Sequence, residues 1–126
     1  MRRAVFATLV MGLFFAPVSA RAECAGRPGT HVVLVSNSYD PDVLVWDSKQ
    51  RLLDYQAGGW SVAKMLLPHA LLARAGTKAV VQSCQLNIVH PKYQLAPADA
   101  AGIKLTSGPY KGRYGWVMAA DLHAHR

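Results

Sequence analysis

The sequence predicts one small domain with a mainly β fold. Short runs rich in β-branched residues recur along the chain, and clusters of Gly, Pro, Asn and Asp bound them. Helical character is confined to residues 48–67, which can hold one or two short helices. About 104 residues follow an apolar leader, a length that suits a single domain. We therefore expect residues 1–22 to be a signal peptide and residues 23–126 to form one domain.

The leader has the three parts of a cleavable signal peptide. Arg2 and Arg3 precede 13 uncharged residues, 4–16, whereas a helix needs about 20 apolar residues to span a bilayer. Small residues then allow cleavage after Ala22, by the A-x-A pattern, or after Ala20. An uncleaved membrane anchor is the alternative. The pattern predicts an exported protein, periplasmic or secreted, with no transmembrane segment after cleavage.

Cys24 and Cys84 are the only cysteines. An oxidising compartment favours a disulfide between them, and closing a loop of this length would stabilise the fold by ~4 kcal/mol in the chain-entropy model. Two free thiols are the alternative. A lipid anchor on Cys24 is disfavoured, because Glu23 stands where lipoprotein signals carry a small residue.

The charge argues against a nucleic-acid partner. Loss of the leader removes Arg2, Arg3 and Arg21, which leaves eleven basic residues against seven acidic ones and a net charge of +4. The basic residues are scattered, without a run of four or more. Such a mild excess of positive charge is compatible with binding to anionic envelope surfaces. The net charge alone supports this, because the basic residues form no cluster in the sequence.

Two strands are predicted at the start of the domain. Residues 30–36 (THVVLVS) form the first strand and residues 43–46 (VLVW) the second, and we expect them to pair as a hairpin. Residues 37–42 (NSYDPD) form the turn between them. Asp40 and Asp42 are explained by turn chemistry, because Asp side chains bond nearby backbone amides.

The helical region comes next. Asp47 or Ser48 can cap a helix over residues 49–57, which Gly58 and Gly59 would end. Residues 61–67 (SVAKMLL) predict either a second helix with a serine cap or an irregular apolar segment. Pro68 would stop that segment.

The remaining elements are predicted to be strands joined by turns. Residues 71–73 and 77–84 suggest a second hairpin with its turn at 74–76, and residues 86–89 extend or follow it. A loop is then expected at 91–101, a strand at 102–106, a turn region at 107–114, a final strand at 115–119, a terminal turn at 121–122 and a polar tail at 123–126.

Residues 103–122 (IKLTSGPYKGRYGWVMAADL) resemble the closing half of bacterial SH3-like domains of the SH3b type. In those domains a strand, a Gly-bearing turn, a G-W-V strand and a short D-L turn follow in this order. The resemblance implies a small SH3-like barrel, with Leu122 packing onto its end and residues 30–67 as an addition. Residues 85–101 separate the second predicted hairpin from the closing strands, and this long separation departs from the compact family pattern.

Residues 107–115 also look like the KOW motif, which occurs on SH3-like barrels of ribosomal and transcription-elongation proteins. That resemblance would give Lys111 and Arg113 an RNA-binding or protein-binding role. The export leader argues against it, so we expect no nucleic acid among the partners.

Aromatic and basic residues gather near this turn and form the candidate binding site. They are Tyr110, Lys111, Arg113, Tyr114 and Trp116. Such a groove could accept a proline-containing peptide, an envelope protein or a cell-wall glycan such as peptidoglycan. The alternative is that Tyr114 and Trp116 pack in the barrel, and Trp46 and Trp60 are interpreted as core residues.

Catalysis has little support in the sequence. Cys84, His90 and Asp99 have the residue types of a thiol hydrolase, but no family signature surrounds the cysteine and the disulfide is its better use. The five histidines lack metal-ligand spacing, and no Gly-rich phosphate loop occurs. We expect no cofactor and no metal. A non-catalytic envelope-binding module is the favoured function; a small thiol-hydrolase-type enzyme and a structural or assembly subunit are the alternatives.

Overall fold

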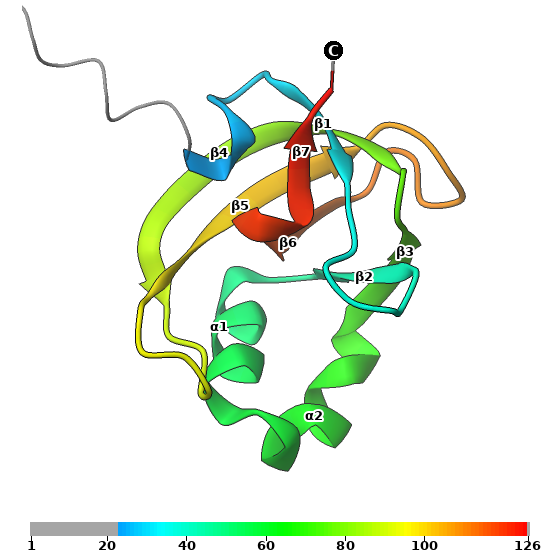
Figure 1. Cartoon of the computed structure of the whole chain (residues 1–126). Coiled ribbons are helices and arrows are strands. Elements are labelled where there is room, and N and C mark those ends of the chain that lie inside the picture. The colour runs from blue at the N-terminus through cyan, green and yellow to red at the C-terminus, as the bar shows by residue number, and fades with distance from the viewer. Residues whose placement is uncertain (1–22, 126) are drawn as a thin grey trace, which may run out of the picture.

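Seven antiparallel strands form one curled sheet in the order β3-β2-β6-β5-β4-β1-β7. The computed structural model describes residues 23–125, so the expected signal peptide lies outside the described residues. The strands are β1 (His31–Leu34), β2 (Asp42–Trp46), β3 (Ala70–Arg74), β4 (Lys78–Val89), β5 (Ala98–Leu105), β6 (Tyr114–Met118) and β7 (Leu122–Ala124). The predicted mainly β fold is confirmed, as a curled half-barrel (Figure 1).

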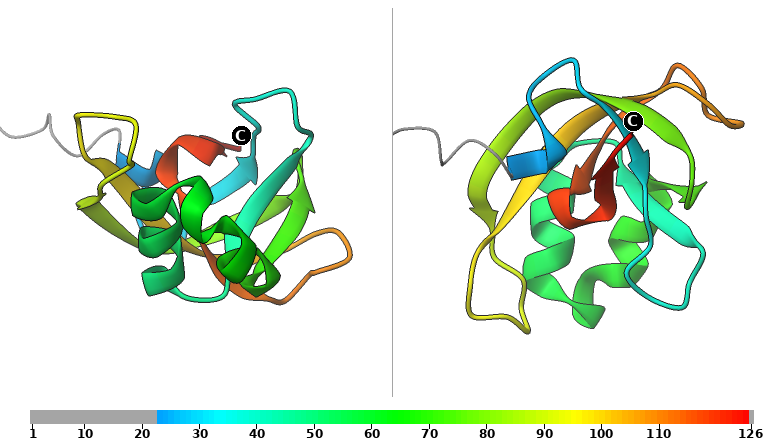
Figure 2. Two further views of the ribbon diagram at one scale, coloured as in Figure 1. Left: turned by 90° about the horizontal axis from the view of Figure 1, so that it is seen from below. Right: turned by 45° about the horizontal axis from the view of Figure 1, so that its top comes forward.

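Two short helices lie together at one end of the sheet, as the turned views in Figure 2 show. They are α1 (Lys49–Gly58) and α2 (Trp60–Leu66), and both fall within the predicted region. Short 3-10 turns are η3 (Glu23–Ala25), η4 (Leu67–His69) and η5 (Ala119–Asp121). Within residues 23–125, no helix is long and apolar enough to cross a membrane.

Ser48 caps α1, which resolves the choice between Asp47 and Ser48. The Arg51 backbone N–H donates to Ser48 Oγ at 3.2 Å, while the Asp47 carboxylate pairs with the Arg51 guanidinium at 2.9 Å. Gly59 ends the helix with φ of 62°, a left-handed conformation that a side chain would resist. Residues 60–66 then form the second helix, but the predicted serine cap is wrong: Ser61 Oγ donates to the Gly58 carbonyl instead.

The predicted pairing of the first two strands is wrong. β1 pairs with β4 and β7, as in the registers Val32↔Ala79 and Val33↔His123. β2 instead pairs with β3 and meets β6 at Trp46↔Trp116. The turn between the strands exists, but it carries the chain across the molecule, because the apolar partners of each strand come from distant segments.

The second predicted hairpin is also wrong in its pairing. A turn does occur at Ala75 and Gly76, but β3 pairs with β2 and β4 pairs with β1 and β5. Gly76 N–H donates to the Leu34 carbonyl, and Leu34 N–H donates to Thr77. The turn is thus anchored to the end of β1, and the two strands leave it for opposite sides of the curl.

The C-terminal part is longer and more regular than predicted. β5 starts at Ala98 rather than after a loop ending at 101, and β6 is followed by η5 and a further strand, β7. β7 takes up part of the expected polar tail, since it bonds to β1 along one edge. Leu122 is buried in the core, as the SH3-like resemblance led us to expect.

The core has two parts. The larger lies inside the curl and contains Val32, Leu34, Val81, Ile103 and Leu105 among its fully buried side chains. The smaller lies between α1 and the sheet, where Trp46 and Leu52 are buried. Trp46 is 1% exposed, so its predicted core position is confirmed.

A disulfide joins η3 to β4. Cys24 and Cys84 are bonded, with their Cα atoms 5.8 Å apart, which confirms the predicted pair. Cys24 is buried in the larger core, so the bond ties the start of the domain to the middle of the sheet. This pairing is compatible with an oxidising environment outside the cytoplasm.

Candidate binding surfaces

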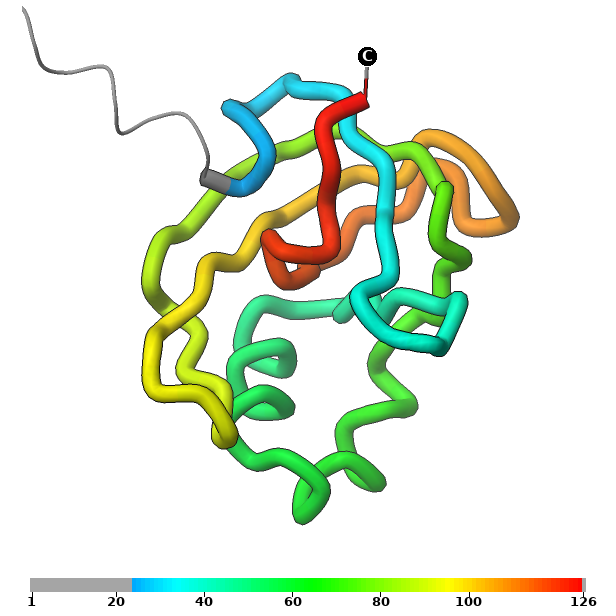
Figure 3. The backbone as a smooth tube through the Cα atoms, in the orientation of Figure 1, coloured from blue at the N-terminus to red at the C-terminus, as the bar shows by residue number. Residues whose placement is uncertain are grey.

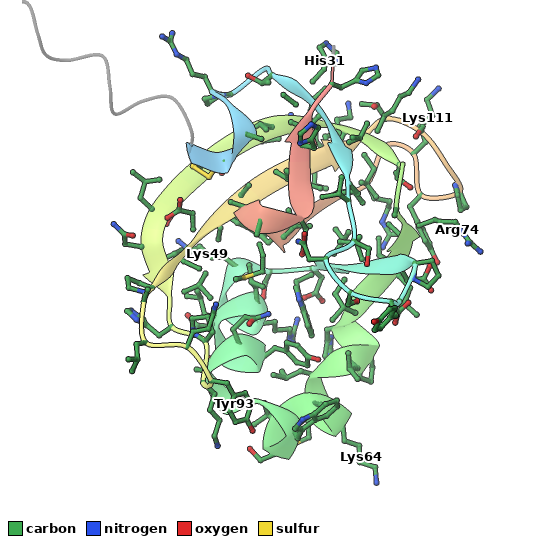
Figure 4. All side chains as sticks on the ribbon, viewed as in Figure 1. His31, Lys49, Lys64, Arg74, Tyr93 and Lys111 are labelled. Carbon is green, nitrogen blue, oxygen red and sulfur yellow. A yellow bond between two sulfur atoms is a disulfide. The ribbon has the colours of Figure 1, made fainter. Side chains whose placement is uncertain are left out.

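The five predicted site residues divide into a turn group and a strand group. Tyr110, Lys111 and Arg113 belong to the turn that joins β5 and β6, whereas Tyr114 and Trp116 lie on β6 itself. Backbone bonds from Leu105 N–H to Arg113 and from Gly112 N–H to Leu105 close the turn. Figure 4 shows Lys111 projecting from the outer end of this turn, away from the helices.

Tyr110 has mainly a packing role. Its half-buried side chain packs against the larger core, and it borders a groove with Leu72, Arg74 and Thr77. Lys111 and Arg113 are exposed at the turn. The predicted set is therefore not one continuous site, because Tyr110 faces a different groove from Tyr114 and Trp116.

Tyr114 and Trp116 share one face of β6, because alternate residues of a strand point to the same side. Gly115 and Val117 between and beyond them are buried. Tyr114 is 62% exposed and Trp116 is half-buried. These two rings form what we call the β6 aromatic face, defined by Tyr114 and Trp116.

Two lysines approach the β6 aromatic face. Lys104 Nζ lies 5.5 Å from the centre of the Tyr114 ring, and Lys49 Nζ lies 5.7 Å from that of Trp116. Both distances suit cation–π attraction. Lys49 also donates to Gln85 Oε1 at 3.1 Å, which fixes its position. The face is therefore both aromatic and positively charged.

A shallow cavity of about 200 Å³ adjoins the β6 aromatic face. Gly102 is one of its lining residues and lies directly across from Trp116 in the sheet. Polar groups on its rim can donate or accept hydrogen bonds; they come from Asp47, Gln82 and Ser83. A ligand here would meet aromatic rings, hydroxyl and amide groups, and the Asp47 carboxylate, which is paired with Arg51. The ammonium groups of Lys49 and Lys104 lie beside the two rings.

A second aromatic cavity was missed by the sequence analysis. It measures about 320 Å³ and lies between the α1–α2 junction and the loop joining β4 to β5. Trp60, predicted to be a core residue, is 80% exposed on its edge, so that prediction is wrong. The signal was present in the sequence as a Trp directly after Gly58-Gly59, outside the apolar strand pattern.

A third cavity, of about 280 Å³, is lined by both apolar side chains and carboxylates. Asp40, Asp42 and Asp121 line it, together with Asn37. Burial raises the pKa of Asp121, and a hydrogen bond from Asn37 Nδ2 partly offsets the rise. The Asp42 backbone N–H donates to Asp40 Oδ1 at 2.9 Å, which is the turn chemistry expected from the sequence.

The thiol-hydrolase set considered from the sequence is not available in the described part of the chain. Cys84 is bonded to Cys24, which leaves no free thiol for His90 or Asp99 to activate. Across residues 23–125, no group of three or more His, Cys, Asp or Glu side chains could hold a metal ion. Comparison with protein-family models, with curated proteins and with solved structures finds no significant match.

Proposed function

We propose that this chain is an exported, non-catalytic SH3-like module that binds a component of the cell envelope. The observation that carries the proposal is the β6 aromatic face, where Tyr114 and Trp116 lie beside the ammonium groups of Lys104 and Lys49. Exposed aromatic rings next to cations are well suited to recognition, because the rings provide apolar contact while the charges orient a ligand. The expected location is the periplasm or the exterior.

Three features support export and the SH3-like assignment. The leader at 1–22 has the parts of a signal peptide, and the Cys24–Cys84 disulfide suits an oxidising compartment. Residues 103–122 run as a strand, a Gly-bearing turn, a G-W-V strand and a short turn, the order on which the resemblance rests.

The ligand carries a negative charge next to an apolar or ring-shaped part. Lys49 and Lys104 favour an anionic group, and the rings favour a flat or apolar partner surface. A peptide, an envelope protein and a peptidoglycan strand with its carboxylates all meet this description. Lys111 and Arg113 at the nearby turn would add long-range attraction rather than direct contact.

The first test measures binding to isolated peptidoglycan sacculi and to detergent-solubilised envelope fractions. Tyr114→Ala and Lys104→Ala should each weaken binding by roughly tenfold, the effect of removing a strong contact residue. Tyr114 is exposed and Lys104 is partly exposed, and neither belongs to the buried core, so the fold should persist. Tyr39→Ala is the matched control, because Tyr39 is exposed in the 35–41 loop. Unchanged binding of both surface variants to every fraction would refute the proposed face.

Export and processing need their own test. The intact mass of protein recovered from cell fractions should begin at Glu23, with two hydrogens fewer than the reduced form. Alkylating reagent should add to the chain only after reduction, because both cysteines are bonded. A full-length or lipidated chain would contradict the proposed processing.

One observation favours the structural or assembly-subunit alternative. β3 forms an edge of the sheet among the described residues, and Leu72 on this strand is exposed. An exposed apolar residue on an edge strand is suited to pairing with another chain. Leu72→Lys would disrupt a stable complex recovered from the native envelope, but would leave a ligand on the β6 aromatic face bound.

A further inference from the structure

The cavity beside Trp60 is formed by segments that are distant in the sequence. Residues 90–97, between β4 and β5, run next to the junction of α1 and α2 (Figure 3). The Lys92 backbone N–H donates to the Gln56 carbonyl at 2.8 Å and fastens the loop to α1. Figure 4 shows Tyr93 at the tip of this loop, beside the helices. This hydrogen bond holds the loop that forms one side of the cavity close to α1.

Gly59 permits this close approach. A Cβ on Gly59 would lie 3.2 Å from Lys92 Cδ and 3.3 Å from the Tyr93 ring, tighter than ordinary packing. Tyr55 also lines the cavity and contacts Trp46, with ring centres 4.8 Å apart. Tyr55 is therefore held by a core residue, and Tyr93 lies close to the junction of α1 and α2. Such preorganisation lowers the entropy lost on binding.

Trp60 and Tyr93 have large aromatic side chains that are mostly exposed and bury little area in the core. Trp60 is 80% exposed and Tyr93 is 73% exposed, although both line a mainly apolar cavity. At about 320 Å³, the cavity falls within the ~300–1,000 Å³ range of ligand pockets. Aromatic side chains gathered around an open pocket are expected to contact a ligand rather than the protein interior.

We propose that this cavity binds a saccharide, stacked on the rings of Trp60 and Tyr93. The C–H face of a pyranose ring is apolar and flat enough to lie on an aromatic ring, while its hydroxyl groups point outward. Gln56 and Gln94 line the cavity, and their amides offer donors and acceptors together, as sugar hydroxyl groups do. This site is separate from the β6 aromatic face, and the two share no lining residue.

Two other ligand classes fit the cavity less well. A proline-rich peptide would present carbonyl acceptors but few N–H donors, because proline lacks the backbone N–H, so the glutamine carbonyls would lose their partners. A quaternary ammonium ligand needs an aromatic cage without a competing cation, whereas Lys92 is the only charged residue lining this cavity. A neutral or anionic saccharide meets neither objection.

Titration with oligosaccharides tests the proposal. Intrinsic fluorescence of exported, disulfide-bonded protein is followed as chitotetraose, cellotetraose or tetragalacturonate is added, since these sugars cover acetylated, neutral and acidic types. At least one should bind and change the emission of Trp60, which water contacts in the free protein. Tyr93→Ala should weaken this binding by at least about tenfold. Trp60→Ala should abolish the fluorescence change and, by calorimetry, weaken binding to a similar degree.

A matched control keeps the result specific. Tyr39→Ala, an exposed tyrosine outside the cavity, should bind the sugar as the wild type does. Tyr114→Ala on the β6 aromatic face shows whether the sugar binds there instead. No binding of any of the three sugars up to about 10 mM would overturn the proposal. Sugar binding that survives Trp60→Ala and Tyr93→Ala would overturn it as well. Binding of decaproline in place of sugars, lost in both variants, would show a peptide site and refute the saccharide assignment. Loss of sugar binding in Tyr114→Ala alone would place the sugar on the other face.

Discussion

Trp116 lies across Gly102 on neighbouring strands, and the absence of a side chain at Gly102 makes room for the indole. The two residues are register partners between β5 and β6. A Cβ at Gly102 would lie 3.2 Å from Trp116 Cζ2 and 2.8 Å from Ser83 Oγ. The β6 aromatic face therefore depends on a glycine in the adjacent strand. A substitution at Gly102 can shift the Trp116 ring while Trp116 itself is unchanged.

Gly102→Ala should disturb this arrangement. The added methyl group must displace Ser83 or the Trp116 ring, so we expect the free energy of unfolding to fall by ~1–3 kcal/mol. Urea denaturation measures it. Because Ser83 Oγ is the nearest obstacle, Gly102→Ala should cost less in a Ser83→Ala background, a coupling that a double-mutant cycle detects. Wild-type stability of Gly102→Ala would show that the contact is easily relieved.

The disulfide should be a major source of stability. Cys24 and Cys84 close a loop with a sequence separation of 60, so the Cys24→Ala/Cys84→Ala variant should lose ~4 kcal/mol in the chain-entropy model. Chemical denaturation of both proteins, with and without reductant, checks this. Reductant should lower the wild-type midpoint and leave the double variant unaffected. Equal midpoints for reduced and oxidised wild type would contradict the prediction.

Trp46 and Trp60 should contribute very differently to stability. Trp46 is buried against α1, so Trp46→Ala should cost ~3–5 kcal/mol, whereas the exposed Trp60→Ala should change stability by less than about 0.5 kcal/mol. Urea unfolding compares them. If Trp46→Ala does not fold, Trp46→Phe tests the same difference by fluorescence. Trp46→Phe should remove the blue-shifted emission of a buried tryptophan, whereas Trp60→Phe should remove the red-shifted emission of an exposed one. A large loss in Trp60→Ala would mean that its side chain packs against the protein.

Because of Asp121, the free energy of unfolding should fall as the pH rises above the ordinary pKa of an aspartate. Burial raises its pKa in the folded state, with Asn37 opposing the rise, so the folded protein holds a proton that the unfolded chain has already lost. The free energy of unfolding therefore declines with pH between the ordinary pKa and the raised one, and stays lowered above it. Asp121→Asn should remove that decline and be more stable than wild type at pH 7.

Thermal melts of both proteins from pH 3 to pH 8 provide the measurement. The two curves should nearly coincide at pH 3, where the carboxyl group is protonated in folded and unfolded chains alike. Asp40→Asn is the matched control, because Asp40 lines the same cavity but is exposed in the loop. A lower stability of Asp121→Asn at pH 7 would show that the ionised carboxylate, held by Asn37, stabilises the fold.

Local chemistry was enough to predict several elements from the sequence. The β-branched runs predicted most strands. Asp47 or Ser48 at one end and Gly58-Gly59 at the other predicted the bounds of α1, because capping and turn formation involve residues only a few positions apart. The two cysteines, read with the leader, predicted the disulfide. Ile103 and Leu105 lie in the strand predicted at 102–106, and both are buried in the larger core.

Strand partners and exposure were decided by the tertiary structure alone. Turn residues predicted β1 next to β2 and β3 next to β4, yet each strand pairs with segments that complete the apolar interior of the curl. The same holds for the site: Tyr110 became a packing residue, while Trp60 came to line an open cavity with Tyr93. The sequence of a strand predicts which of its side chains share a face, but not which strand pairs with it. The presence of a tryptophan predicts a large side-chain area, but not which residues cover it. Both depend on long-range burial, which only the assembled sheet specifies.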